Sequence, residues 1–110
     1  MPLDKKINKL INQRITDSRN RAKKNGWEHD IDAEYVRFLL VQSGKRCPYS
    51  GQKFVFEKGN PNMFSVDRVD NSKGYIKGNV VVTSVRANKA KLDMSLEEFK
   101  EFCLNVTEVL

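Results

Sequence analysis

The sequence is poor in the residues that build disulfide frameworks and metal clusters, with two cysteines and one histidine in 110 residues. Cys47 and Cys103 lie far apart without framework spacing, which favours a reducing cytoplasm. The longest uninterrupted apolar run, residues 38–41, is too short to span a membrane. The first residues also lack the apolar segment of a secretory signal. We therefore expect a cytoplasmic protein with no membrane partner.

Positive charge, in contrast, is abundant and unevenly distributed. Lys and Arg number 20 against 14 Asp and Glu, for a formal net charge of +6. Between positions 5 and 24 the basic residues are interrupted by a single acid, Asp17. Such a block can neutralise phosphates and gain affinity from counterion release; the alternative is a solvated helix face that keeps the protein soluble. The residues predicted to contact nucleic acid are Arg19, Arg21, Lys23, Lys24, Lys73 and Lys91.

The first 45 residues have helical periodicity. Apolar residues recur at helical spacing from Leu3 to Ala22, which predicts an amphipathic helix that ends near Asn25–Gly26. Asp32 suits the N-cap of a second helix, which is predicted to stop at Ser43–Gly44.

Strand character follows, and then helix again. Residues 52–56 and 63–69 alternate between apolar and polar side chains and are predicted to form an antiparallel pair. An apolar run at 80–82 precedes a short predicted helix at 84–91, and Ser95 with Glu98 forms a capping box that starts a last helix. We expect one α+β domain over residues 1–110: a basic helical part (1–45), a strand–strand–helix unit (46–91) and a C-terminal helix (95–110).

The residues with most chemical content lie in the segment 64–91. Asp67 ends a predicted strand and supplies a carboxylate, a hard oxygen ligand suited to Mg²⁺ or Mn²⁺. Asn88 can present an amide oxygen towards it from the short helix, and Lys91 follows on the same helical face. With waters and a phosphate, these oxygens predict a site for phosphodiester hydrolysis. The alternative for Asp67 is a strand-end carboxylate paired with Lys or Arg.

Three motifs in this segment occur in a set order. They are Ser65-Val66-Asp67-Arg68-Val69-Asp70, then the stretch from Gly74 to Val80, then Asn88-Lys89-Ala90-Lys91. With the upstream turn Cys47-Pro48-Tyr49-Ser50-Gly51, the set resembles the HNH, or ββα-metal, endonuclease superfamily, especially its small phage and bacterial members. The resemblance covers about 45 of 110 residues. It implies a metal-dependent enzyme that hydrolyses DNA inside a bacterial cell, with double-stranded DNA as partner.

The resemblance also implies roles for single residues. Asp67 takes the first metal-ligand position, Asn79 the central Asn and Asn88 the last ligand position. Arg68 stands where the family usually has a general-base His. Because arginine stays protonated, Arg68 is expected to hold the phosphate and stabilise transition-state charge instead.

Another group must then activate the water, or a metal-bound hydroxide must act alone. Asp70 and Tyr75 are the nearby candidates. We favour Asp70, because the reference pKa of tyrosine, about 10, is a handicap. The alternative for Asp70 is an Asx turn with Ser72 or Lys73. His29, the single histidine, is far from the motifs and flanked by turn residues, so it is the less favoured base.

A second departure from the family concerns zinc. Many members brace the unit with two Cys pairs around a structural zinc ion. The corresponding positions here are Cys47, Ser50, Ser84 and Ala87, so we predict no structural zinc. Apolar packing should replace it, from Phe54, Phe56, Phe64, Val80 and Val82.

Three further residues are assigned to packing. Cys47 is expected to be a small buried side chain, and Cys103 to face the core from the last helix. Trp27 is expected to anchor a loop rather than to stack on a base.

Two functional hypotheses therefore stand at this point. The first is a metal-dependent DNA endonuclease. The second is a catalytically silent DNA-binding module that keeps the ββα fold while Arg68 replaces the base. The sequence leaves the oligomeric state and the cleavage specificity open.

Overall fold

The structure is a computed structural model that describes residues 2–110, with side chains described from residue 5 onward. Leu3, predicted on the apolar face of the first helix, lies outside the described side chains. The elements in chain order are α1 (Pro2–Asn25), α2 (Ala33–Gln42), β1 (Phe64–Arg68), β2 (Val80–Ser84), α3 (Val85–Lys91) and α4 (Leu96–Val109). The chain is a mixture of helices and a small antiparallel sheet, as the α+β prediction expected.

The two N-terminal helices form where the apolar spacing and the caps predict them. In α1, Ile7, Ile11 and Ile15 are buried, and the helix ends before Gly26, whose φ of +73° suits a glycine. Asp32 caps α2 by accepting a hydrogen bond from the backbone N–H of Tyr35 at 2.8 Å.

The sheet pairs β1 with β2. The strand predicted at 63–69 is confirmed as β1, but its predicted partner, the segment 52–56, was wrong. Phe64 lies opposite Ser84 and Arg68 opposite Val80 in an antiparallel register. The segment 52–56 is not a strand; its backbone makes one isolated bridge, between Lys53 and Arg46. Phe54 is buried against the ring of Phe64, at 6.3 Å between centroids. The alternation at 52–56 therefore reflects burial of aromatic side chains under the sheet rather than strand pairing.

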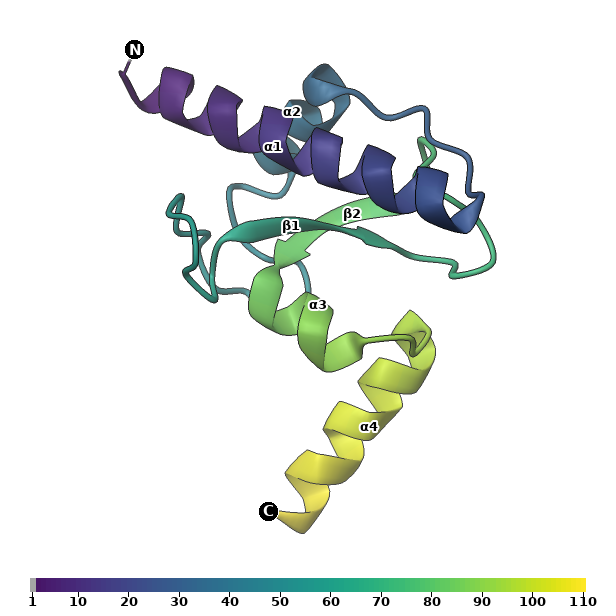
Figure 1. Ribbon diagram of the computed structural model, residues 1–110. Helices are drawn as coiled ribbons and strands as arrows, with labels where there is room; N and C mark the ends of the chain where they lie inside the picture. Colours follow the sequence, from purple (N-terminus) through teal and green to yellow (C-terminus); the bar gives the residue numbers. More distant parts are fainter. Residues whose placement is uncertain (1) are drawn as a thin grey trace.

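The chain passes from β2 directly into α3. Ser84 ends the strand and caps the helix, because its hydroxyl oxygen accepts a hydrogen bond from the N–H of Ala87 at 3.0 Å. The short helix predicted at 84–91 is thus confirmed. Figure 1 shows α1 on one side of the two-stranded sheet and α3 on the other.

The C-terminal helix differs from the prediction in its packing. The capping box of Ser95 and Glu98 is present, but no residue of α4 is buried, and Figure 1 shows the helix extending away from the sheet. Cys103 is exposed, so its assignment to the core was wrong. Helical spacing of apolar residues marks a face but does not say whether anything covers it. Among residues 2–110, no helix is long and apolar enough to cross a membrane.

Candidate functional site

The two halves of the motif meet where α3 packs on β1. Ser65 and Asp67 are two residues apart and share one face of the strand. Asn88 and Lys91 are three apart and share one face of the helix. Asn88 Nδ2 donates to Ser65 Oγ at 3.0 Å, and Lys91 Nζ lies 3.3 Å from Asp67 Oδ2. The contact thus has a Ser65–Asn88 end and an Asp67–Lys91 end.

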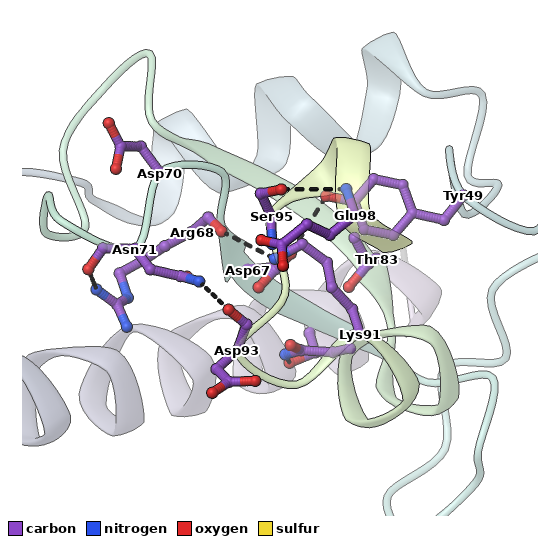
Figure 2. Close-up of polar contacts among 12 residues, drawn as sticks. Tyr49, Asp67, Arg68, Asp70, Asn71, Thr83, Lys91, Asp93, Ser95 and Glu98 are labelled. Carbon is purple, nitrogen blue, oxygen red and sulfur yellow. Dashed lines mark hydrogen bonds and ion pairs between the residues drawn. The ribbon is translucent and has the colours of Figure 1, made fainter. Parts of the chain in front are cut away.

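The Asp67–Lys91 end is closed to solvent. Asp67 is 7% exposed and Lys91 is 0% exposed. The Tyr49 hydroxyl donates to the same oxygen, Asp67 Oδ2, at 3.2 Å (Figure 2). Burial, and then the neighbouring Asp67 carboxylate, raise the pKa of Tyr49 above its usual range, so the phenol stays protonated. Tyr49 was missed by the sequence interpretation, although it lies in the turn that carries part of the resemblance.

The burial of Lys91 corrects one prediction. Lys91 was expected to contact nucleic acid, but its ammonium group faces the interior, where it pairs with Asp67 and lies 3.5 Å from the carbonyl oxygen of Arg68. A fully buried lysine requires such a partner, because an isolated buried charge is very costly. Lys91 is therefore part of the framework that fixes α3 on β1.

The predicted metal ligands suit a hard cation in their chemistry, but both are engaged elsewhere. The contacts of Asp67 fall on Oδ2, and the amide nitrogen of Asn88 is directed to Ser65. Within the part of the chain that the structure describes, no three His, Cys, Asp or Glu side chains gather as a metal site. In the described structure the Oδ1 oxygens of Asp67 and Asn88 make no hydrogen bond or ion pair, so these are the oxygens that a divalent ion would use.

Asn79 organises the loop between the two strands. Its Oδ1 accepts from the backbone N–H of Asp70 at 2.9 Å, and its Nδ2 donates to the carbonyl oxygens of Asp70 and Gly74 at 3.1 and 2.8 Å. The side chain is 6% exposed. All of its contacts are to its own loop, so the geometry makes Asn79 a positioning residue rather than a group that touches a substrate.

The Gly-Tyr pair of the same motif fixes the loop to the segment after α1. A Cβ on Gly74 would lie 2.1 Å from the carbonyl oxygen of Glu28, so only glycine fits there. Tyr75 donates its backbone N–H to that carbonyl at 2.9 Å. Because the side chain of Tyr75 is 3% exposed, it is not free to approach a substrate as a base.

Arg68 is also held by this loop. Its guanidinium carbon lies 3.5 Å from the centroid of the Trp27 ring, and Nη1 donates to the carbonyl oxygens of Asn71 and Lys73, both at 2.9 Å. Arg68 therefore joins the loop, the strand and the segment after α1. Trp27 packs against the core, as predicted, and carries the guanidinium on its face. The side chain of Lys73 is exposed at the tip of the loop.

Asp70 forms the Asx turn that was the alternative to catalysis. Its Oδ1 accepts from the Ser72 hydroxyl at 2.6 Å and from the Ser72 N–H at 2.9 Å. The hydroxyl bond first, and then the backbone bond, lower the pKa of Asp70 below its usual value. Figure 2 shows its carboxylate pointing away from Asp67. A lowered pKa and this orientation make Asp70 a weak proton acceptor for chemistry at Asp67.

The positions that correspond to the family's zinc ligands lie together. Cys47 is 1% exposed, and its sulfur accepts a hydrogen bond from the N–H of Ser84 at 3.2 Å. Ser50 lies three residues further along the turn, where its hydroxyl oxygen accepts a hydrogen bond from the N–H of Gln52 at 3.4 Å. Ser84 is bonded in turn to the N–H of Ala87. Cys47 is thus a small buried side chain, as expected, at the junction of the turn, β2 and α3.

His29 does not reach Asp67 through any contact in the described structure. Its Nε2 lies 2.8 Å from the Ser18 hydroxyl, and its ring lies beside that of Tyr75 at 5.9 Å between centroids. Burial, and then Arg19, lower the pKa of His29 below its usual value.

The basic residues of α1 are divided between several faces of the helix. Arg14 and Arg21 are seven residues, or about two turns, apart and line the groove beside β1. Arg19, Lys23 and Lys24 are exposed at other angles around the helix and line neither groove that Arg14 and Arg21 share. The sequence interpretation included Arg21 but missed Arg14 and Lys89, which faces the same groove from α3. The helical period of 3.6 residues could have paired Arg14 with Arg21.

Comparison with known proteins identifies a phage relative. The chain is 34% identical over 91 residues to an uncharacterized 29.0 kDa protein from the dda-modA intergenic region of Enterobacteria phage T4. The match covers 83% of this chain and 36% of that protein, so the chain spans about a third of the length of its relative. No family profile matches the chain, and no solved structure matches it significantly.

Proposed function

We propose that the chain is an HNH-type module that binds duplex DNA and cleaves it with Mg²⁺ or Mn²⁺. The observation that carries this proposal is the meeting of the two motif halves: Asn88 lies against Ser65, and Lys91 pairs with Asp67, where α3 crosses β1. Residues more than 20 positions apart thus come together in the order of strand, strand and helix that the resemblance implies. The proposed setting is the inside of a bacterial cell, which the phage relative supports.

The corner occupied by Cys47 gives independent support. Three of the positions that hold zinc in many HNH proteins are joined here by hydrogen bonds, Cys47 to Ser84 and Ser84 to Ala87, although Ser50, Ser84 and Ala87 cannot serve as thiolate ligands. A hydrogen bond and apolar burial join the turn to the strand–helix junction. We therefore expect the unit to fold without a structural zinc ion.

In this proposal Asp67 and Asn88 would hold the divalent ion, which supplies Lewis-acid activation of the scissile phosphate. Lys91 orients the Asp67 carboxylate through their ion pair in the absence of the ion. Asn79 fixes the loop. Arg68 donates from Nη1 to two loop carbonyls and lies on Trp27, so it would contact a phosphate on the Trp27 side of β1 through Nε and Nη2 and not the phosphate at Asp67. The proposal does not use Asp70 as the proton acceptor, because its pKa is lowered and its carboxylate points away from Asp67.

A second candidate function is DNA binding without cleavage, and the Asp67–Lys91 pair favours it. The Lys91 ammonium lies 3.3 Å from the carboxylate oxygen, on the group that a metal would need. Arg68, at the position of the usual base, is committed to Trp27 and two loop carbonyls. Both candidate functions share the basic surface and differ only in chemistry at Asp67.

Nicking of supercoiled plasmid by the full chain separates the two. We expect cleavage that depends on Mg²⁺ or Mn²⁺, is lost with a chelator and is lost in Asp67→Asn. The matched control is Asp93→Asn, which alters an exposed carboxylate without a hydrogen-bond or ion-pair partner of its own in the described structure. Binding of DNA without cleavage under every divalent ion overturns the endonuclease proposal. Equal cleavage by Asp67→Asn and wild type places the activity elsewhere.

A further inference from the structure

A groove of about 330 Å³ opens at the Ser65–Asn88 end of the contact between β1 and α3. Its polar lining comes from three elements: Arg14 and Arg21 from α1, Ser65 from β1, and Asn88 and Lys89 from α3. The groove therefore lies beside Asn88, one of the two residues proposed to hold the metal ion.

The charges around this groove have one sign. Of the side chains that the structure describes, from residue 5 onward, Arg14, Arg21 and Lys89 line it and no acidic residue does. A neighbouring groove of about 300 Å³ shares Arg14 and Arg21 but also contains Asp17, whose carboxylate lies 3.8 Å from Arg14 Nη1. An anion is therefore favoured in the groove of about 330 Å³, because its lining adds Lys89 and does not include the Asp17 carboxylate that pairs with Arg14.

Hydrogen-bond donors in the groove are fixed and available. Arg14 is held in place because Nε donates to the carbonyl oxygen of Phe64 at 3.0 Å, which leaves Nη2 for a ligand. Ser65 Oγ accepts from Asn88, so its own proton is free to be donated. Arg21 and Lys89 are exposed at the rim, and Arg21 Nη1 also donates to the Tyr75 hydroxyl at 3.4 Å. A partly buried guanidinium with an adjacent hydroxyl is a suitable site for one phosphate oxygen pair.

We propose that this groove binds a backbone phosphate of duplex DNA and thereby places the neighbouring phosphodiester at Asn88. The inference rests on the proposed function for the identity of the ligand, since the groove alone selects phosphate chemistry. Arg14 and Arg21 lie about 10 Å apart along α1, so they contact the DNA backbone along a line rather than at one point. The basic residues at other angles of α1, among them Lys23, contribute general attraction only.

The test compares two double variants with equal loss of charge. Arg21→Ala with Lys89→Ala removes two groove cations, while Lys53→Ala with Lys100→Ala removes two exposed cations outside it. The affected side chains are exposed, so both proteins should keep the thermal midpoint of the wild type. We expect the groove variant to bind a DNA duplex at least about tenfold more weakly. The slope of log K against log salt concentration should become less steep by about 1.8, because two contacts between a cation and a phosphate are lost. Equal affinities and salt slopes for the two variants overturn the proposal.

A titration followed by NMR distinguishes the two sources of phosphate. The duplex should shift the Arg14 Nε–H signal and the side-chain amide of Asn88, and inorganic phosphate should shift the same signals more weakly. Saturation by inorganic phosphate that the duplex does not displace overturns the assignment to DNA. Loss of affinity in the groove variant without any cleavage by wild type overturns only the endonuclease. Cleavage by wild type with an unaffected groove variant overturns only the groove.

Discussion

The two ends of the contact between β1 and α3 use charge in opposite ways. At one end Asp67 and Lys91 are buried, paired and sealed by Tyr49. At the other, Ser65 and Asn88 face a groove whose cations remain partly or fully exposed. A buried pair is fully satisfied within the fold, whereas exposed cations of one sign remain available to a ligand. The same two elements thus provide a fixed framework at one end and a binding surface at the other.

The largest loss of stability should come from breaking the ion pair at the Asp67–Lys91 end. Asp67→Ala leaves Lys91 charged and buried without its partner, which costs about 3–5 kcal/mol of unfolding free energy. Adding Lys91→Met should restore most of that stability without restoring cleavage. Asn88→Ala, at the open end, removes one half-buried hydrogen bond and should cost about 1 kcal/mol or less. Urea denaturation of the four proteins checks the comparison, and equal losses for Asp67→Ala and Asn88→Ala would contradict it.

Arg68 tests how far the closed framework extends along the loop. Arg68→Ala removes the stacking on Trp27 and two hydrogen bonds, and should lower the unfolding free energy by about 2 kcal/mol. Arg68→His places an imidazole on the side of Trp27, away from the Asp67 carboxylate, so we expect no gain of cleavage near neutral pH. Plasmid nicking at several pH values measures this. A rise in activity for Arg68→His would show that position 68 holds the base.

The local elements of this fold were accessible from the sequence because their causes are local. The caps at Asp32 and Ser95 mark where two of the helices start, and the apolar spacing around Ile7 to Ile15 marks the buried face of α1. The partner of β1 was not accessible in this way. Alternation gives the period of a segment and not the strand it pairs with, so the segment 52–56 was assigned in place of β2.

The candidate site was predicted in part for the same reason. The motif positions indicated which residues meet, and Asn88 and Lys91 do face β1. Whether a charged side chain points outward or inward depends on packing from elsewhere in the chain. Tyr49, 18 residues before Asp67, helps to bury the pair, and the prediction that Lys91 contacts nucleic acid did not take this burial into account. Arg14 was missed because the prediction used the number of basic residues in the block and not the angular position of each residue around the helix.

Substitution of Asp70 should have a smaller effect than the substitutions of Asp67 and Arg68. Asp70→Asn keeps an acceptor for the Ser72 hydrogen bonds and removes a carboxylate that points away from Asp67. We expect cleavage to change by less than about threefold, whereas loss of a general base typically costs 10²-fold or more. Single-turnover cleavage with saturating enzyme makes the measurement independent of affinity. A loss of that larger size would make Asp70 the proton acceptor despite its Asx turn.

The smallest effect concerns His29, which lies outside both ends of the contact. Ser18 donates its single hydroxyl proton to the carbonyl oxygen of Ile15, so the neutral His29 ring donates to Ser18 from Nε2. Protonation adds charge at Nδ1, which burial and Arg19 disfavour, and the pKa of His29 is therefore lowered in the folded state. As the pH falls below about 6.5, the unfolded chain binds the proton before the folded chain does. The contribution of His29 to stability is therefore present above that pH and is lost as the pH falls to the pKa of His29 in the folded state.

The variant His29→Gln tests this, because it keeps a donor for Ser18 and removes the titrating group. We expect urea midpoints between about pH 7.5 and pH 5.5 to fall less in the variant than in the wild type. An identical pH dependence of the urea midpoint in the variant and the wild type would contradict this, because it would mean that the pKa of His29 is the same in the folded and the unfolded state.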